Sequence, residues 1–183
     1  MIILKSLIFL YETVAEWEAA PAAFVLNLHG EVDTFGFDTT PLKGVCTLPF
    51  KPEKSIDQIN PDDYDVLIIP GGYPEHYEGR EELFDIIRKF NDQKKLIGAI
   101  CAGPVALLWA GVLEGKKFTT SAAPEDRKGF DLTNFVDEYA VRDGNIITAT
   151  GNGFTEFALQ IGDALEVFEE GEREDLIDLF RHP

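Results

Sequence analysis

The sequence has 183 residues, a length that suits one domain with a full hydrophobic core. Hydrophobic residues make up 45% of it, which excludes an intrinsically disordered chain. Acidic residues outnumber basic ones by 33 to 16, and the formal net charge is −17. Because this charge repels phosphate backbones and anionic lipids, we expect no nucleic-acid partner and no membrane partner.

The amino-terminal run is apolar, but Lys5 interrupts it and acidic residues follow. It therefore does not match a signal peptide, and no stretch of the sequence is long enough to span a bilayer. The two cysteines, Cys46 and Cys101, are too few for a disulfide scaffold in a chain of this size. We expect a cytoplasmic protein in which both thiols are free.

Short apolar runs alternate with helical stretches along the chain, a pattern typical of a mostly parallel sheet with helices on both faces. Strands are predicted at 4–10, 32–37, 66–69, 96–100 and 146–150. Helices are predicted at 15–28, 81–91, 104–110, 155–168 and 173–180. The runs 66–69 and 96–100 are nearly all apolar, as strands buried on both faces are.

Two hairpins are also predicted. Asp143-Gly144 is a hairpin turn signal between residues 139–141 and 146–150. The proline-containing segment 38–63 predicts a hairpin with irregular connections. We expect residues 1–183 to form a single domain, with 172–183 as a short C-terminal helical extension.

The strand at 96–100 leads directly into Cys101, and the small residues Ala102 and Gly103 precede a helix with Pro104 in its first turn. This order is that of a nucleophile elbow with sulfur in place of oxygen. The start of the helix is expected to lower the pKa of the thiol and so to populate the thiolate. The alternative interpretation is a buried structural cysteine.

Two further elements are expected at the same edge of the sheet, because the carboxyl ends of parallel strands lie together. Gly71 and Gly72 follow the strand at 66–69 and expose backbone N–H groups, which suit an oxyanion hole with the amide of Ala102. Glu18 follows the first strand, and a buried acid there could share a proton with Cys101. An ordinary turn and a solvated helix face are the alternatives.

With these motifs the sequence resembles the ThiJ/PfpI superfamily, which includes the intracellular protease I group and the Parkinson-associated deglycase. The resemblance covers nearly the whole chain. It rests on the Ile-Ile-Pro-Gly-Gly turn, on Gly-Ala-Ile-Cys-Ala-Gly-Pro, on Trp17-Glu18 with Pro21, and on residues 152–159.

The resemblance implies a flavodoxin-like three-layer α/β sandwich, as in the class I glutamine amidotransferases. It implies that Cys101 is the reactive cysteine of a nucleophile elbow and that Glu18 is its acid partner. It also implies oxyanion amides at Gly72 and Ala102, and a homodimer.

This sequence departs from the superfamily in its histidines. Protease-like members carry a histidine directly after the cysteine, where this chain has Ala102. Deglycase-like members carry one in the segment that corresponds to residues 119–122, where this chain has none. A standard Cys–His dyad is therefore not evident, and the pattern is closest to a Glu–Cys subgroup.

Three residues are secondary candidates for the site. His76 follows Glu75 in the loop after the glycine pair, and it could approach Cys101 from its own or a neighbouring subunit. An exposed loop histidine is the simpler interpretation. Glu75 and Ser121 are candidate substrate-pocket residues.

Three functions remain open from the sequence. The first is a cysteine-dependent hydrolase or lyase that acts on a small carbonyl or amide substrate. The second is a non-catalytic redox-sensing or stress-response protein in which a small oxidant modifies the same cysteine. A glutaminase subunit is the third, and the absence of a late histidine disfavours it. No metal-ligand spacing or dinucleotide fingerprint is present, so we expect neither a metal nor a cofactor.

Overall fold

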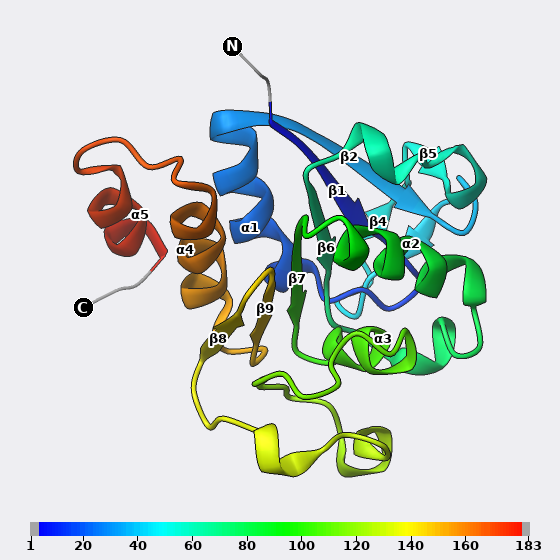
Figure 1. Cartoon of the computed structure of the whole chain (residues 1–183). Coiled ribbons are helices and arrows are strands. Elements are labelled where there is room, and N and C mark those ends of the chain that lie inside the picture. The colour runs from blue at the N-terminus through cyan, green and yellow to red at the C-terminus, as the bar shows by residue number, and fades with distance from the viewer. Residues whose placement is uncertain (1–3, 181–183) are drawn as a thin grey trace.

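The computed structural model describes residues 4–180 and has a central sheet with the strand order β5-β2-β1-β6-β7-β9-β8 (Figure 1). The strands are β1 (Leu4–Phe9), β2 (Gly30–Gly36), β5 (Lys54–Ser55), β6 (Val66–Ile69), β7 (Leu96–Ile100), β8 (Ala140–Asp143) and β9 (Ile146–Ala149). Of the neighbouring pairs among these strands, only β8 and β9 run antiparallel. The predicted mostly parallel sheet and the hairpin at Asp143-Gly144 are confirmed.

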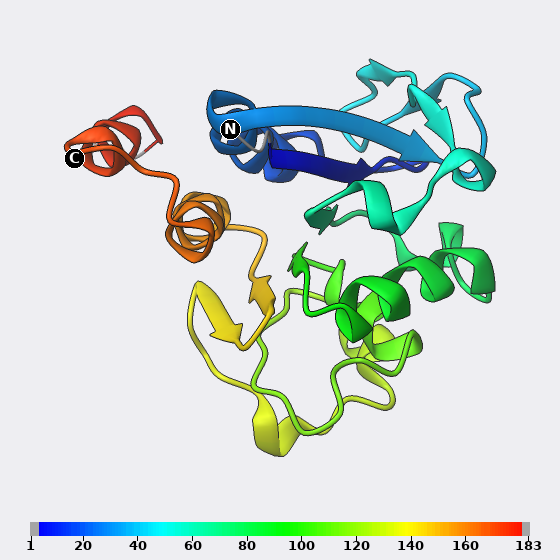
Figure 2. The same ribbon diagram turned by 45° about the horizontal axis from the view of Figure 1, so that its top comes forward.

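Helices cover both faces of this sheet. They are α1 (Glu16–His29), α2 (Glu81–Asp92), α3 (Pro104–Trp109), α4 (Phe154–Leu165) and α5 (Glu172–Phe180). Figures 1 and 2 show α1 and α4 on one face and α2 and α3 on the other, while α5 lies outside α4. The α/β three-layer sandwich is therefore confirmed.

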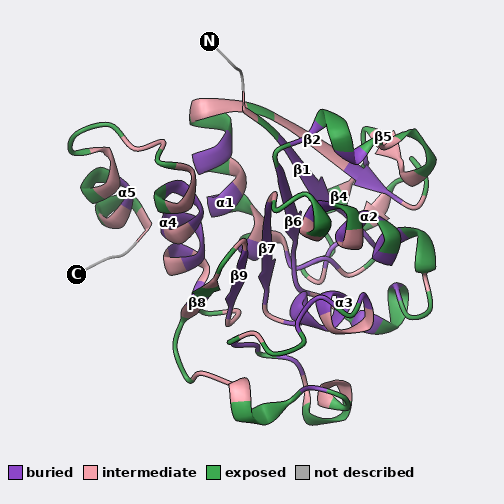
Figure 3. Cartoon of the chain, in the orientation of Figure 1, coloured by how far each residue is buried: buried purple, intermediate pink, exposed green. Residues whose placement is uncertain are grey.

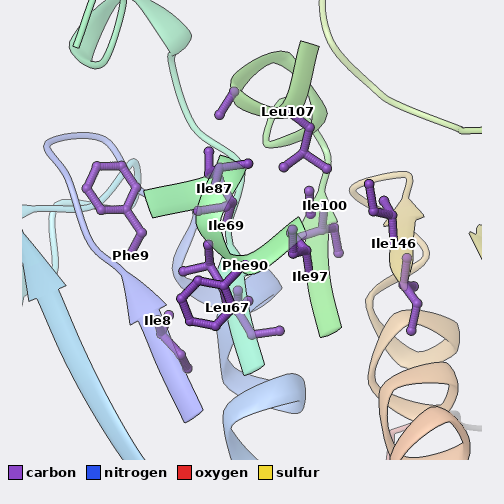
Figure 4. Packing of buried hydrophobic residues seen from close by; sticks show 14 of the residues in the cluster. Ile8, Phe9, Leu67, Ile69, Ile87, Phe90, Ile97, Ile100, Leu107 and Ile146 are labelled. Atoms are coloured by element: carbon purple, nitrogen blue, oxygen red, sulfur yellow. The ribbon is translucent and has the colours of Figure 1, made fainter. Parts of the chain in front are cut away.

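The core lies around β6 and β7, every residue of which is buried (Figure 3). Figure 4 shows Leu67 and Ile69 of β6 with Ile97 of β7 beside Ile87 and Phe90 of α2. The helical spacing of apolar residues in α2 thus places them on one face of the helix, which packs against the sheet. Each such side chain stabilises the fold by roughly 1.5–3 kcal/mol when fully buried.

The helix predicted at 155–168 ends earlier than expected, at Leu165. Glu166 adopts a left-handed conformation with φ of 55°, and the chain turns back. The ring of Phe168 then lies against Gly162, where a Cβ would come within 2.1 Å of the ring. Helical periodicity continues through this turn in the sequence, so the reversal was not predicted.

Residues 38–63 contain the predicted hairpin, formed by β3 (Leu42–Lys43) and β4 (Pro49–Phe50). They also contain the short strand β5, which pairs with the end of β2 and was not predicted. Strand β2 itself begins at Gly30, immediately after α1, where a Cβ would lie 2.2 Å from the Leu4 carbonyl oxygen. Close contact with β1 therefore explains the glycine at this point.

The chain between α3 and β8 is mostly irregular but well anchored. Phe118 bridges to Phe135 and stacks on Phe130 at a ring-centroid distance of 4.8 Å. This packing holds the following residues, 119–122, against the end of β7. No helix among residues 4–180 has the length and apolar character needed to cross a membrane.

The C-terminal helix α5 is attached to the outside of the sandwich. Leu176 is buried against α1 and α4, and Phe180 meets Phe24 of α1 edge to face at 5.9 Å. His29 Nε2 also lies 3.3 Å from Glu172 Oε2. Residues 181–183 of the expected extension lie outside the described part of the chain.

Candidate active site

Four adjacent parallel strands, β1, β6, β7 and β9, end at the same edge of the sheet. Glu18 lies in the first turn of α1, just after β1, and Gly71 follows β6. Cys101 follows β7, and Gly151 follows β9. The topology therefore brings four residues that are distant in sequence to one place.

Cys101 occupies a strained backbone position between β7 and α3, with φ of 60°. Its N–H donates to the Ala149 carbonyl at 2.8 Å, and its carbonyl accepts from Thr120 Oγ1 at 2.6 Å and from Ser121 N–H at 3.0 Å. These three bonds fix a conformation that costs on the order of 1–3 kcal/mol. They show which neighbours hold the thiol in position; its role as a nucleophile stays a prediction.

Glu18 is buried, with 1% of its surface exposed, although its neighbour Trp17 is 46% exposed. Its Oε2 accepts the N–H of Gly71 at 3.0 Å. Its carboxyl group also shares a hydrogen bond with the side chain of Cys101. The acid is thus held against the sulfur by the turn after β6, and it does not lie on a solvated helix face.

Glycines make this approach possible. A Cβ on Gly71 would lie 2.2 Å from Glu18 Oε2 and 2.5 Å from Cys101 Cβ. A Cβ on Gly151 would lie 2.8 Å from Glu18 Oε1 and 3.1 Å from Cys101 Sγ. Any larger residue at either position would push the carboxyl group and the sulfur apart.

The carboxyl group and the thiol form a coupled acid pair. Burial raises the pKa of Glu18 to about 7, although the hydrogen bonds from Cys101 and Gly71 act in the opposite direction. Burial, followed by the charge of an ionised Glu18, raises the pKa of the Cys101 thiol above its usual range. Two negative charges are costly in this buried setting, so near neutral pH the pair carries at most one.

The sequence predicted a lowered pKa for the Cys101 thiol, and this prediction is wrong because the pKa is raised. The N–H of Ala102 donates to the sulfur and does lower the pKa, but burial has the larger effect. Helix α3 spans only Pro104–Trp109, so its dipole is small. A thiolate at Cys101 consequently requires that Glu18 hold the proton.

The amide of Gly71, the third oxyanion candidate, binds Glu18, and the amide of Ala102 binds the sulfur. Gly72 has φ of 141°, and a Cβ there would lie 2.3 Å from the Thr13 carbonyl oxygen. Ala102 is fixed by Tyr77, whose hydroxyl donates to the Ala102 carbonyl at 3.1 Å. The Ala102 amide thus lies beside the sulfur, while an oxyanion role of either amide stays a prediction.

Of the three secondary candidates, Ser121 lies next to the Cys101 site, whereas no hydrogen bond or ion pair within residues 4–180 joins Glu75 or His76 to it. Ser121 Oγ accepts the N–H of Gly151 at 2.9 Å and so belongs to the shell around Cys101. Glu75 and His76 are exposed and lie in the 3-10 turn Pro74–His76, in which Pro74 is buried. Within residues 4–180, the His76 side chain makes no hydrogen bond or ion pair, and no contact joins it to Cys101.

Sequence reasoning did not identify Gly151, Thr120 or Tyr77 as parts of this site. Gly151 had a recognisable signal, because it follows a buried strand as Gly71 does. Tyr77 and Thr120 had none, since their contacts to residues 101 and 102 depend on the tertiary path of the chain. Cys46 is exposed and is positioned elsewhere, with its N–H donating to Glu16 Oε1 at 2.9 Å.

The described residues contain no group of three or more histidine, cysteine or acidic side chains placed to hold a metal ion. The fold and the site together define an α/β protein with a candidate cysteine site. In it a buried glutamate lies against a partly exposed cysteine at the carboxyl edge of the sheet. The model of the DJ-1/PfpI family matches residues 4–164, and the chain belongs to this family.

Comparison with individual proteins agrees with this assignment. The chain is 32% identical over 124 residues to the deglycase PfpI of Pyrococcus furiosus, a match that covers 67% of this chain and 75% of the relative. It is 36% identical over 119 residues to an uncharacterised protein of Methanocaldococcus jannaschii, covering 62% of this chain but only 58% of that protein. Drosophila melanogaster DJ-1beta superposes with a TM-score of 0.84 at 28% identity, over 99% of this chain and 100% of the other.

Proposed function

We propose that this chain is a cysteine-dependent enzyme acting on a small carbonyl or amide compound, in the manner of a deglycase, protease or amidase. The observation that carries the proposal is the hydrogen bond between the buried Glu18 carboxyl group and the side chain of Cys101. The family includes a relative named as a deglycase, which supports a carbonyl substrate.

In the first step, the sulfur of Cys101 attacks the carbonyl carbon of the substrate. A C–S bond forms, the S–H proton passes to the Glu18 carboxylate, and the π electron pair of the carbonyl moves to its oxygen. The amides of Gly72 and Ala102 are the donors proposed for that oxygen. Glu18 then returns the proton to the oxygen, which gives a neutral hemithioacetal with all atoms and charges balanced.

The proposal is tested by following the consumption of methylglyoxal, a simple amide and a peptide by purified protein. Replacement of Cys101 by alanine is expected to abolish turnover of the true substrate. The matched control is Cys46→Ala, which removes an exposed thiol outside the site and should leave the rate unchanged. Equal rates for wild type and Cys101→Ala would refute an enzymatic role of this cysteine.

A second function is favoured by the partial exposure of Cys101 and by the absence, within residues 4–180, of an imidazole bonded to its sulfur. In this alternative the protein is a redox or stress sensor, and hydrogen peroxide is the oxidant. The thiolate attacks a peroxide oxygen, the O–O bond breaks, and hydroxide leaves as sulfenic acid forms; a second peroxide yields sulfinic acid. Mass spectrometry after mild peroxide treatment should show oxidation at Cys101 before Cys46. The reverse order would contradict this alternative.

We also propose that the protein acts in the cytoplasm as a homodimer. Trp17, Phe24 and Leu28 lie on α1 with 43–47% of their surfaces exposed, and Leu48 is 54% exposed. Spacings of seven and four residues put the three α1 side chains on one face of the helix, and Leu48 N–H donates to Glu16 at the start of that helix. A second copy of the chain is the partner that we propose for this surface.

A further inference from the structure

A second candidate site lies at the edge of the sheet opposite Cys101. The residues that precede β6, β7 and β9 border a hollow of about 630 Å³. Its charged and polar lining consists of Asp65, Lys94, Lys95, Lys116, Arg142 and Asn145. The volume is within the range of small-molecule pockets, which is roughly 300–1,000 Å³.

The basic residues of this hollow lack carboxylate partners. In a chain with 33 acidic and 16 basic residues, each cation has many carboxylates available to it. Ion pairs engage the side chains of Lys5, Lys54, Arg80, Arg88 and Arg173. Across residues 4–180, none of the four cations in the hollow forms one. Four unpaired cations have therefore gathered in one place on a strongly acidic protein.

Local contacts orient two of these cations toward the β8–β9 turn. Arg142 Nε donates to the Gly144 carbonyl at 3.1 Å, which leaves its terminal N–H groups for another acceptor. Lys116 Nζ lies 3.7 Å from the position that a Cβ on Gly144 would take. The turn therefore brings a guanidinium group and an ammonium group to one rim of the hollow.

The other two cations come from the turn that leads into β7. Lys95 Nζ donates to the Pro61 carbonyl at 2.7 Å and lies 5.7 Å from the centre of the Phe90 ring. Lys94 is exposed and has a left-handed backbone with φ of 58°. The positive lining thus comes from three separate segments of the chain.

The carboxylates and the helix end near the hollow do not account for this charge. Asp65 Oδ2 accepts the backbone N–H of Lys5 at 2.9 Å, and Asp143 Oδ2 accepts that of Lys117 at 2.9 Å. Helix α4 ends at the hollow with Ala164 and Leu165, and a helix C-terminus carries only about half a negative charge. Four cations still outnumber the Asp65 and Asp143 carboxylates and the partial charge of that helix end taken together.

We propose that this hollow binds an organic anion that carries two or more phosphate or carboxylate groups. Arginine and lysine side chains are the usual partners of such oxyanions, and charge-assisted hydrogen bonds to them are short and strong. A bound anion would also relieve the repulsion among the four cations. The site is separate from the cysteine centre and does not depend on the proposed enzymatic function.

The test is isothermal titration calorimetry of the full chain with two probes, pyrophosphate and citrate, which distinguish phosphate from carboxylate ligands. The variant Lys94→Gln/Lys116→Gln/Arg142→Gln should weaken binding of the preferred probe by at least about tenfold. The matched control, Lys43→Gln/Lys51→Gln/Lys128→Gln, makes the same change in net charge at exposed positions outside the lining of the hollow and should stay within about twofold of wild type.

Cys101→Ala should bind the probe as wild type does, because Cys101 lies at the other edge of the sheet. The proposal is overturned if wild type binds neither probe, or if the two triple variants lose affinity equally. Loss of binding in Cys101→Ala would also overturn it, by moving the anion to the cysteine centre.

Discussion

The carboxyl group of Glu18 is hydrogen-bonded to the side chain of Cys101, and its Oε2 also accepts the N–H of Gly71 at 3.0 Å. The acid and the thiol come from elements that follow two different strands, β1 and β7, which are separated by β6 in the sheet. The turn after β6 is therefore the piece that joins them.

Replacing Gly71 or Gly151 by a larger residue should lower turnover, and the loss should be larger where the new Cβ lies closer to the Glu18 carboxyl group. Gly71→Ala places a Cβ 2.2 Å from Glu18 Oε2, whereas Gly151→Ala places one 2.8 Å from Oε1. We expect both variants to lose turnover and Gly71→Ala to lose more, by roughly tenfold or above. Steady-state kcat/KM measures this, with circular dichroism as the check on folding. A fully active Gly71→Ala would show that the close contact is unimportant.

The raised pKa of Glu18 predicts a specific dependence of stability on pH. The folded value is about 7 and the unfolded value is the ordinary 4.5, so the folded state binds more protons between these limits. Stability contributed by the protonated acid is present at low pH and is lost as pH rises through 7, by on the order of 3 kcal/mol.

Glu18→Gln should remove this dependence, because the amide does not titrate. Urea unfolding of both proteins at several pH values between about 4.5 and 8 measures the free energy of unfolding. Glu170→Gln, at an exposed position, is the control and should behave as wild type. Parallel curves for Glu18→Gln and wild type would contradict a buried, proton-holding Glu18.

The sequence predicted much of this arrangement for a physical reason. Apolar runs that end in glycine or cysteine mark where buried strands meet the sheet edge, so Gly71 and Cys101 were recognisable. The burial of Glu18 followed from the resemblance rather than from the pattern, since Trp17 beside it is exposed. The direction in which the Cys101 pKa shifts could not be predicted from the sequence. It depends on the burial of the thiol and on its distance to Glu18, which only the folded chain defines.

Tyr77 is predicted to support the site through the backbone of Ala102. Its hydroxyl is buried and donates to the Ala102 carbonyl at 3.1 Å, while that carbonyl also accepts Val105 N–H at 2.9 Å. Tyr77→Phe should therefore cost about 1 kcal/mol of stability, since one acceptor bond remains. Thermal unfolding measures this cost. Tyr139→Phe, at a side chain 55% exposed, is the control, and an equal effect in both variants would rule out a specific role.

The proposed dimer surface predicts the effect of a single charge on α1. Phe24→Asp places a carboxylate among Trp17 and Leu28 on the exposed side of the helix, and its desolvation would oppose association. Light scattering after size exclusion should show a dimer for wild type and a monomer for the variant. The exposed Leu132 lies on a different part of the chain, so Leu132→Asp should leave the dimer intact. A monomeric wild type would refute the dimer.

The most direct test of the coupled pair is the rate at which iodoacetamide alkylates Cys101, measured against pH in wild type and in Glu18→Gln. If Glu18 takes the proton of the thiol, the wild-type rate should rise with a midpoint near 7, the pKa of that carboxyl group. In Glu18→Gln no carboxyl group titrates beside the thiol, so the rise near pH 7 should disappear and the rate should follow the ionisation of the thiol itself. Superimposable pH profiles for the two proteins would contradict the account.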